Sequence, residues 1–465
     1  MNHPNRSEAE ALFFQGIRYM QTGDNGNAEI CFENAVQLAP DLAEAHTNLA
    51  MLLGLRNEDQ AAEMHYQCSI ASNPCYSQTH LNLGVLLAKQ KRFIEAEAAY
   101  RKAIELNAGS PDAWSNLGVL YACMKRETEA ERCYRTALFL DETYAKARFN
   151  LSYILLRQGR FEEGWQSLEA RDWYAALAEQ LLMPRWQGES LAGKSLLICF
   201  EAGFGDVIQF CRYAEILKEQ GASVITLLCH PPLKKLLSRL AGVDAIISFN
   251  EPLPSSGFDF WTPLLSIPHH CKTRLDSIPA RIPYLHASAD RIEKWQPLVP
   301  QHGLRVGLVW RGSTQFENDA DRSLPSLVLL APLWSIKNIT FISLQKGAGE
   351  NEVPPDGLPL TSLGPQLADF ADTAAVVACL DLVICVDTAV AHLAGALGKP
   401  CWVLLPDYKT DWRWLTERRD SPWYPEVMRL FRQSSMGDWT PVIADVVSEL
   451  ERMVKEAENL PHIAD

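Results

Sequence analysis

Hydrophobic positions in the first third of the chain recur with the spacing of amphipathic helices, arranged in pairs that repeat. A small residue recurs in the first helix of each pair, 34 residues apart each time, at Gly16, Ala50, Gly84, Gly118 and Ser152. The second helix carries an alanine and, four positions later, an aromatic residue: Ala28 and Phe32, Ala62 and Tyr66, Ala96 and Tyr100, Ala130 and Tyr134. Small residues let paired helices approach, and the aromatic rings fill the space between them. The pattern predicts helix pairs that bury their apolar faces against their neighbours.

These units resemble tetratricopeptide repeats in both period and positional pattern. Four complete repeats are followed by a partial fifth that begins at Ala145, where Gly164 takes the place of the second-helix alanine. We predict an α-helical solenoid over residues 8–175. Its concave surface would bind a peptide or protein, and the alternative is a spacer or dimerisation arm.

From about residue 182 the pattern changes to short apolar runs separated by helical segments, which predicts parallel β-sheets. The expected strands are residues 195–200, 223–230, 245–249, 305–310, 339–345, 382–387, 401–405 and 428–431. The expected helices are residues 207–221, 231–242, 323–336, 368–380, 389–398 and 438–459. We predict two Rossmann-like halves, residues 190–298 and 303–457, that face a cleft and bind ligands at the carboxyl ends of their strands.

Residues 188–195, GESLAGKS, spell the P-loop pattern. A P-loop follows a strand and opens a helix. Here the segment precedes the strand at 195–200, so Lys194 would lie at the start of that strand, away from the ligand end. We interpret the segment as an entry turn and expect no nucleoside triphosphate there.

The glycine turn EAGFGD, residues 201–206, directly follows that first strand. Gly203 and Gly205 permit a tight turn and the close approach of a ligand to the backbone. Asp206 would begin the next helix, either as an N-terminal cap or as a general base in the cleft.

A second candidate site is DTAVAHLAGALGKP, residues 387–400. Asp387 and Thr388 would cap a helix whose free N–H groups and dipole favour a phosphate. His392 lies on nearly the same face, where it would contact a sugar or diphosphate, or pack between helix and sheet.

Basic residues follow two further strands. Arg311 and Arg322 would bind a diphosphate through charge-assisted hydrogen bonds, and Lys346 would reach the same cleft or be solvated. The DAD sequence at 319–321 has the pattern of a DxD metal-binding motif, and a solvated loop is the alternative.

The net charge of −14 and the pI of about 5.3 argue against general nucleic-acid binding. No apolar run reaches the roughly 18–20 residues of a membrane span, and we expect no secretory signal. The twelve scattered cysteines indicate reduced core thiols. We therefore expect a cytoplasmic protein without a membrane span.

Together, GFGDV at 203–207 and DTAVAHLAGALGKP at 387–400 resemble glycosyltransferase family 9, the heptosyltransferases of GT-B fold. The resemblance implies that Asp206 is the catalytic base. It implies that Asp387, Thr388 and His392 line the nucleotide-sugar site, and that Arg322 is the counterpart of a basic residue of the family.

Repeats ahead of a GT-B module resemble the layout of protein O-GlcNAc transferases and bacterial flagellin glycosyltransferases. The layout implies a bacterial enzyme that glycosylates a protein, with flagellin as one candidate acceptor. We expect an inverting transfer from a nucleotide-sugar, without cofactor or metal. The alternatives are a non-catalytic interaction scaffold with a degenerate GT-B domain, and a sugar-nucleotide epimerase or hydrolase.

Overall fold

The computed structural model describes residues 4–253, 256–355 and 357–459. The chain divides into two compact units, Met1–Leu151 and Ser152–Asp465, and each is described separately. No helix of the described ranges combines the length and apolarity needed to cross a membrane.

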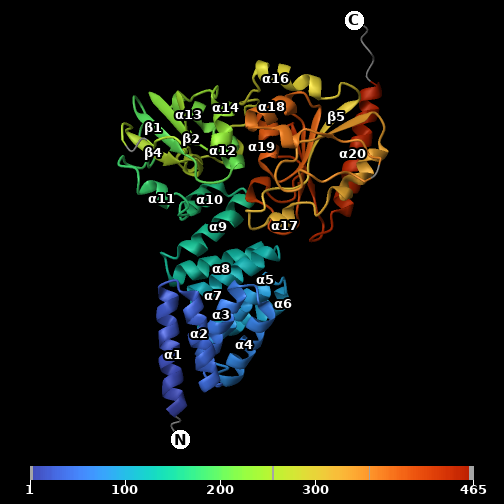
Figure 1. Ribbon diagram of the computed structural model, residues 1–465. Helices are drawn as coiled ribbons and strands as arrows, with labels where there is room; N and C mark the ends of the chain where they lie inside the picture. The colour runs from blue at the N-terminus through green and yellow to red at the C-terminus, as the bar shows by residue number, and fades with distance from the viewer. Residues whose placement is uncertain (1–3, 254–255, 356, 460–465) are drawn as a thin grey trace. The chain divides into compact units, whose positions relative to one another are not determined.

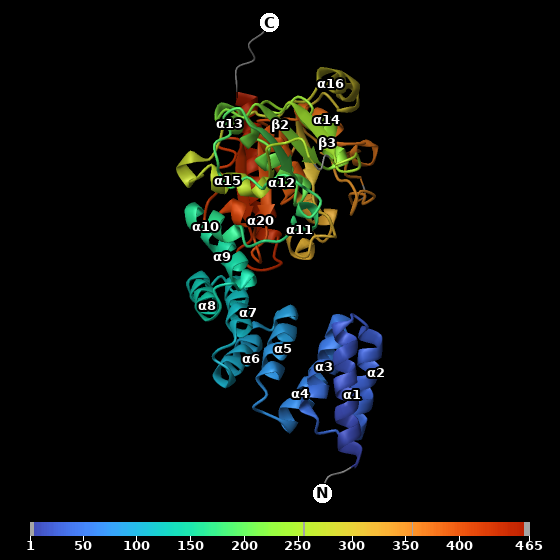
Figure 2. The ribbon, with the colours of Figure 1, turned by 90° about the vertical axis from the view of Figure 1, so that its left-hand side faces the viewer.

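The first unit is a solenoid of antiparallel helix pairs (Figures 1 and 2). Its helices are α1 (Pro4–Gln21), α2 (Asn25–Leu38), α3 (Ala43–Leu55), α4 (Asp59–Ser72), α5 (Ser77–Lys89), α6 (Phe93–Leu106), α7 (Pro111–Cys123), α8 (Glu127–Leu140) and the first part of α9 (Ala145–Arg157). The second-helix alanines Ala28, Ala62, Ala96 and Ala130 are fully buried. The predicted repeat solenoid is therefore confirmed.

The recurring glycines make the close helix contact. A Cβ atom added at Gly84 would lie 2.6 Å from the ring of Tyr100, and one at Gly118 would lie 2.6 Å from the ring of Tyr134. Both rings are buried, at 3% and 2% exposure. The ring of each second helix therefore occupies the space that the glycine of the first helix leaves open.

Gly84→Ala should consequently lower the free energy of unfolding of the solenoid by about 1–3 kcal/mol, the usual cost of overpacking a core. Gly54→Ala is the matched control, since its Cβ would meet Ala62 and Leu86 only at 4.0 Å. That control should be neutral or stabilising by about 0.4–1 kcal/mol. Urea denaturation followed by far-ultraviolet circular dichroism measures both, and equal effects would contradict the packing argument.

The second unit begins with the rest of α9 and with α10 (Phe161–Leu168) and α11 (Ala175–Ala178). A Cβ atom at Gly164 would lie 2.7 Å from the side chain of Leu156, so α9 and α10 also pack through a small residue. The domain limits expected from the sequence stay predictions.

The first parallel sheet has the strand order β3-β2-β1-β4. This half contains β1 (Ser195–Cys199), α12 (Phe204–Phe210), α13 (Tyr213–Glu219), β2 (Val224–Cys229), η1 (Pro231–Leu233), α14 (Lys234–Leu237), β3 (Ala245–Ser248), β4 (Phe260–Pro263), η2 (Leu264–Ser266), α15 (Ile267–His270), η3 (Leu275–Ser277), α16 (Ala289–Trp295) and η4 (Gln296–Leu298).

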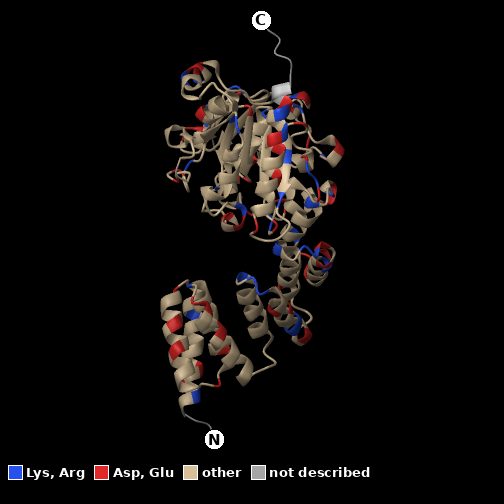
Figure 3. Cartoon of the chain, turned by 90° about the vertical axis from the view of Figure 1, so that its right-hand side faces the viewer, with Lys and Arg blue, Asp and Glu red and all other residues tan. Residues whose placement is uncertain are grey.

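The second parallel sheet has the order β10-β9-β8-β5-β6-β7. This half contains β5 (Leu304–Val309), α17 (Asp319–Arg322), η5 (Leu327–Ser335), β6 (Ile339–Ser343), β7 (Thr361–Ser362), η6 (Gly364–Gln366), α18 (Phe370–Ala378), β8 (Leu382–Val386), α19 (Ala389–Ala396), β9 (Cys401–Leu405), η7 (Trp412–Trp414), β10 (Met428–Arg432) and α20 (Thr440–Asn459). Most strands lack charged residues, which lie mainly in helices and loops (Figure 3). The α/β layout is consistent with a GT-B fold.

Several element predictions need correction, among them the helix expected over 231–242, whose helical part ends at Leu237. The helix expected over 207–221 is interrupted at Cys211–Arg212, where the Arg212 side chain donates to the carbonyl of Gln209 at 2.8 Å. The helix expected over 323–336 is wrong: the segment forms the 3-10 helix η5, and Pro332 within it lacks the N–H of an α-helix. Strands β4 and β7 were not predicted, because β4 is interrupted by a threonine and a proline and β7 has only two residues.

Candidate functional site

Asp206 lies in the first turn of α12, after the glycine turn that follows β1. Its Oδ2 accepts the backbone N–H of Gly203 at 2.8 Å, which caps the helix. Its Oδ1 accepts a hydrogen bond from the guanidinium of Arg413. The Asp206 side chain keeps 21% exposure. The half-buried carboxylate thus caps the helix, which is one of the two alternatives that the sequence left open, and the general-base alternative stays a prediction.

Arg413, in η7, holds this carboxylate from the second half of the unit. Its Nε donates to Oε1 of Gln209 at 2.7 Å, and a terminal nitrogen donates to Oδ1 of Asp411 at 3.0 Å. Its guanidinium also lies 4.3 Å from the centre of the Trp412 ring. The side chain is only 9% exposed. Arg413 therefore joins α12 to the opposite half through charge-assisted hydrogen bonds.

Two opposing influences act on Asp206. Burial raises its pKa above the ordinary value, and the adjacent Arg413 lowers it, with burial the larger effect. Asp411 adds a smaller repulsion that raises the pKa further. A carboxyl group with a raised pKa accepts a proton more readily than an ordinary aspartate, which suits a general base.

The two halves meet where α12 packs on α19. A Cβ atom at Gly205 would lie 2.8 Å from Cδ2 of His392, so only glycine lets the helices approach this closely. This contact brings the carboxyl end of β1 near that of β8. Gly205 acts here through helix packing.

His392 is buried at this contact, at 6% exposure. Its Nδ1 lies 2.9 Å from the hydroxyl of Tyr424, and its ring stacks on Trp414 at 5.3 Å. Burial lowers the pKa of His392 well below its ordinary value, and Arg413 and Arg212 lower it further. The imidazole is neutral at pH 7. It packs between α12 and the segment that contains Trp414 and Tyr424.

Asp387 and Thr388 follow β8 as predicted. Thr388 is the N-cap of α19, but its hydroxyl makes no capping hydrogen bond. Burial raises the pKa of Asp387 to about 6, and repulsion by Asp411 contributes. Arg322 and Arg413 partly oppose this rise. Asp206, Asp387, Asp411, Arg322 and Arg413 therefore form one charged cluster.

The raised pKa of Asp387 gives a pH-dependent prediction. Its proton is bound more tightly in the folded state than in the unfolded state, so this group's stabilisation is lost as the pH rises from about 4 through about 6. Asp387→Asn removes the titration. Relative to wild type, the variant should thus gain stability between pH 4.5 and 6.5, with little further change at pH 7.5. Urea denaturation at those values checks this, and a constant difference would contradict it.

The three predicted basic residues have different surroundings. Arg322 is 15% exposed and donates to Oδ1 of Asp319 at 3.2 Å, within electrostatic reach of Asp387. Arg311 forms an ion pair with Glu352 at 2.7 Å. Lys346 is exposed and has no hydrogen bond or ion pair within the described ranges. Of the three cations, Arg322 belongs to the cluster.

The DAD segment departs from the expected solvated loop, because Asp319 is 8% exposed. Its Oδ1 accepts the hydroxyl of Ser323 at 2.9 Å in addition to Arg322. A Cβ atom at Gly312 would lie 2.5 Å from a terminal nitrogen of Arg322. Asp319 thus binds the Arg322 guanidinium, and the absence of a side chain at Gly312 leaves room for it.

The P-loop pattern lies outside this cluster. Lys194 is 46% exposed and pairs with Asp259 at 3.0 Å, and β1 begins directly after it, so the P-loop pattern lacks its structural context.

Trp412 and Trp423 are buried and pack edge to face on Trp165 of α10. Sequence reasoning missed Arg413 and Asp411. Their signal is the sequence DWR at residues 411–413, an acidic and a basic residue within a stretch rich in tryptophan.

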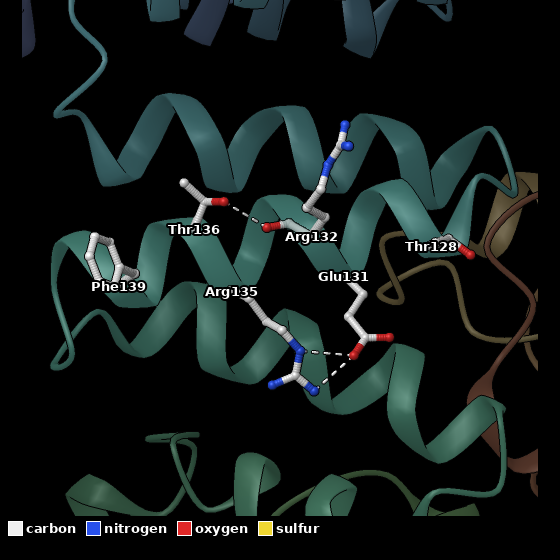
Figure 4. Close-up of a pocket in the computed structure, with 6 residues that line it drawn as sticks. All are labelled: Thr128, Glu131, Arg132, Arg135, Thr136 and Phe139. Carbon is white, nitrogen blue, oxygen red and sulfur yellow. Dashed lines mark hydrogen bonds and ion pairs between the residues drawn. The ribbon is translucent and has the colours of Figure 1, made fainter.

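The solenoid carries a hollow on α8 (Figure 4). It is lined by Thr128, Glu131, Arg132, Arg135, Thr136 and Phe139. Nε of Arg135 donates to Glu131 at 2.9 Å, and Phe139 is 86% exposed. The hollow contains none of the residues predicted to carry chemistry, and it belongs to the surface of the repeats.

Comparison with family profiles supports both parts of the architecture. Profiles described as tetratricopeptide repeat match residues 9–42, 77–109, 99–132 and 126–180. The profile of glycosyltransferase family 9 (heptosyltransferase) matches residues 352–404. This match includes Asp387, Thr388 and His392, while Asp206 lies outside it. The chain thus carries tetratricopeptide repeats and a segment similar to family 9, which supports a glycosyltransferase-like function.

Among curated proteins, the chain is similar to Protein FlbA of Caulobacter vibrioides, with 27% identity over 343 residues. The match covers 66% of this chain and 55% of FlbA, so the chain spans about half the length of that relative. Similar solved structures include Pseudomonas aeruginosa pilF (22% identity, TM-score 0.34, 36% of this chain and 77% of that chain). Another is TTC0263, a thermophilic TPR protein of Thermus thermophilus (22% identity, TM-score 0.32, 37% of this chain and 99% of that chain).

Proposed function

We propose that this protein transfers a sugar from a nucleotide-sugar to a hydroxyl group of a protein acceptor, with inversion and without a metal ion. The observation that carries the proposal is the cluster at the contact of two parallel-sheet halves. There Asp206 lies in the first turn of α12, after the glycine turn that follows β1, and Asp387 and Thr388 directly follow β8. The carboxyl ends of parallel strands are the usual place for ligands in such folds.

In the proposed step, the acceptor oxygen attacks the anomeric carbon and forms the new glycosidic bond. The bond from that carbon to the diphosphate oxygen breaks, and the diphosphate leaves with the electron pair. The hydroxyl proton passes to Asp206, whose pKa is raised by burial. Arg413 acts as a positioning residue, because its buried guanidinium fixes one oxygen of that carboxylate.

The departing diphosphate is assigned to the N-terminus of α19, beside Thr388 and Arg322. The N–H groups of a helix start and a held guanidinium both stabilise developing negative charge. The neutral, buried His392 supports the start of α19 through its stacking on Trp414. Arg311 and Lys346, which follow β5 and β6, are assigned to the outer phosphate.

We assign the acceptor to the tetratricopeptide repeats, whose helix pairs suit protein binding. Binding remote from the reacting atoms can orient an acceptor hydroxyl. Flagellin is one candidate acceptor, and a bacterial cytoplasmic setting fits this assignment.

Two measurements test the proposal on the full chain. Calorimetric titration with UDP, GDP, ADP and CDP should reveal micromolar-range binding of one nucleotide. Co-expression with candidate acceptors, flagellin included, should give a glycosylated product in intact-protein mass spectra. Failure to bind any of the nucleotides would favour a scaffold instead. Turnover of a nucleotide-sugar without any acceptor would favour an epimerase or hydrolase.

A further inference from the structure

A row of aromatic rings follows the carboxyl edge of the four-stranded sheet. Phe200 comes directly after β1, His230 after β2 and Phe249 after β3. The rings of Phe200 and His230 are 4.3 Å apart, and those of Phe200 and Phe249 are 5.5 Å apart. Phe204, the first residue of α12, packs edge-on against His230 at 4.9 Å. We call Phe200, Phe204, His230 and Phe249 the aromatic row.

This row is only partly covered. Phe249 is 54% exposed and Phe204 is 36% exposed. Phe200 anchors the row, because it packs against a buried cluster that includes Leu197 and Leu228. Folding alone does not require large rings at the two exposed positions. A contiguous exposed apolar surface is typical of a binding site.

The row lies beside the proposed base. Phe204 and Asp206 belong to the same first turn of α12, where residues two apart point in different directions. Phe204 also contacts Phe370 at the start of α18, with ring centres 5.2 Å apart. The row therefore extends from the first half to α18 of the second half, and it shares the first turn of α12 with Asp206.

The charges around the row favour an uncharged ligand. Lys234 forms an ion pair with Glu251, and Lys235 forms one with Asp369 at 3.1 Å. Burial lowers the pKa of His230 to about 4, so its ring is neutral at pH 7. These cations are already paired, so the row offers rings rather than free positive charge.

We propose that the aromatic row binds an apolar, preferentially aromatic, side chain of the acceptor polypeptide beside the hydroxyl that receives the sugar. The inference rests on the proposed function and names the feature of the acceptor that this site recognises. Neighbouring side chains of an extended peptide point to opposite sides. A hydroxyl can thus face Asp206 while the adjacent side chain packs on the row. Aromatic pairs of this kind contribute beyond simple burial.

The test measures peptide binding without any donor. Fluorescein-labelled heptapeptides with a central threonine flanked by phenylalanine, by leucine or by glycine are titrated with the full chain, and fluorescence anisotropy gives the Kd. The phenylalanine peptide should bind at least about 5-fold more tightly than the glycine peptide. Phe249→Ala and Phe204→Ala should each weaken it roughly 3- to 10-fold.

Val224→Ala is the matched control, because Val224 is a 41% exposed apolar residue at the opposite end of the same sheet. Its Kd should stay within about twofold of wild type. Equal affinity for all peptides, no binding of any peptide, or an equal loss in the control overturns the inference. If methyl glycosides bind in a Phe249-dependent way while the substitutions leave peptide binding unchanged, the row binds a sugar ring and the inference is overturned.

The inference and the proposed function fail in different ways. Phe249-dependent peptide binding by a chain that binds no nucleotide diphosphate would leave the row intact and remove the transferase proposal. Sugar transfer to a protein acceptor at an unchanged KM in Phe204→Ala and Phe249→Ala would leave the transferase proposal intact and remove the row.

Discussion

Asp206→Asn is expected to lower the rate of sugar transfer by at least about 100-fold, the usual contribution of a positioned general base. The amide keeps the size of the side chain but cannot take the hydroxyl proton. Affinity for the nucleotide diphosphate should stay within about twofold, because the donor is assigned to α19. Single-turnover transfer kinetics and calorimetric titration measure the two effects.

Asp411→Asn is the matched control for this substitution. Asp411 is the other carboxylate that Arg413 contacts, at 3.0 and 3.1 Å, so the variant also removes an anionic partner of the buried guanidinium. It leaves the proposed base in place and should retain at least about a tenth of the transfer rate. Unchanged turnover in Asp206→Asn, or equal losses in the two variants, would remove Asp206 as the base.

The parts of the fold that follow from local periodicity were predictable from the sequence. The 34-residue repeat places a glycine opposite an aromatic ring, and the Gly84–Tyr100 contact follows directly from that spacing. Apolar runs such as residues 195–200 and 382–387 become strands because parallel strands buried on both faces need continuous hydrophobic residues. The helix prediction over 323–336 was wrong, because the apolar spacing of the η5 segment is helical while Pro332 disfavours an α-helix.

The candidate site was predictable only where its residues share a motif. Asp206, Asp387 and His392 each lie beside a strand end, and this placement carries information in the sequence. The partner of Asp206 has no such signal in the sequence, because Arg413 lies 207 residues further along the chain. The packing of the two halves, which places η7 against α12, brings the two residues together. The same reasoning explains Arg311, whose ion pair with Glu352 has no local signal.

A second large effect is expected from Arg171→Met. Both side chains of the Arg171–Glu201 ion pair are buried, at 0% and 1% exposure. Arg171 donates to both oxygens of Glu201, at 2.6 and 2.9 Å. The remaining contact of Glu201 is the backbone N–H of Leu265 at 2.7 Å. Removing the guanidinium leaves a carboxylate in the interior with one donor, which should cost about 3–5 kcal/mol of unfolding free energy.

Tryptophan fluorescence during urea denaturation reports this loss in the second unit, since all thirteen tryptophans except Trp114 lie within residues 152–465. Arg274→Met is the control: Arg274 is 64% exposed and pairs with a similarly exposed aspartate, so its loss should cost less than about 1 kcal/mol. The double variant Arg171→Met/Glu201→Leu removes both charges and should recover at least half of the single variant's loss, because apolar residues can replace a buried ion pair at little cost. A double variant no more stable than Arg171→Met would show that Arg171 contributes through packing instead. Glu201 opens the turn that leads to Asp206, so the transfer rate of Arg171→Met should fall as well, whereas Arg274→Met should leave it unchanged.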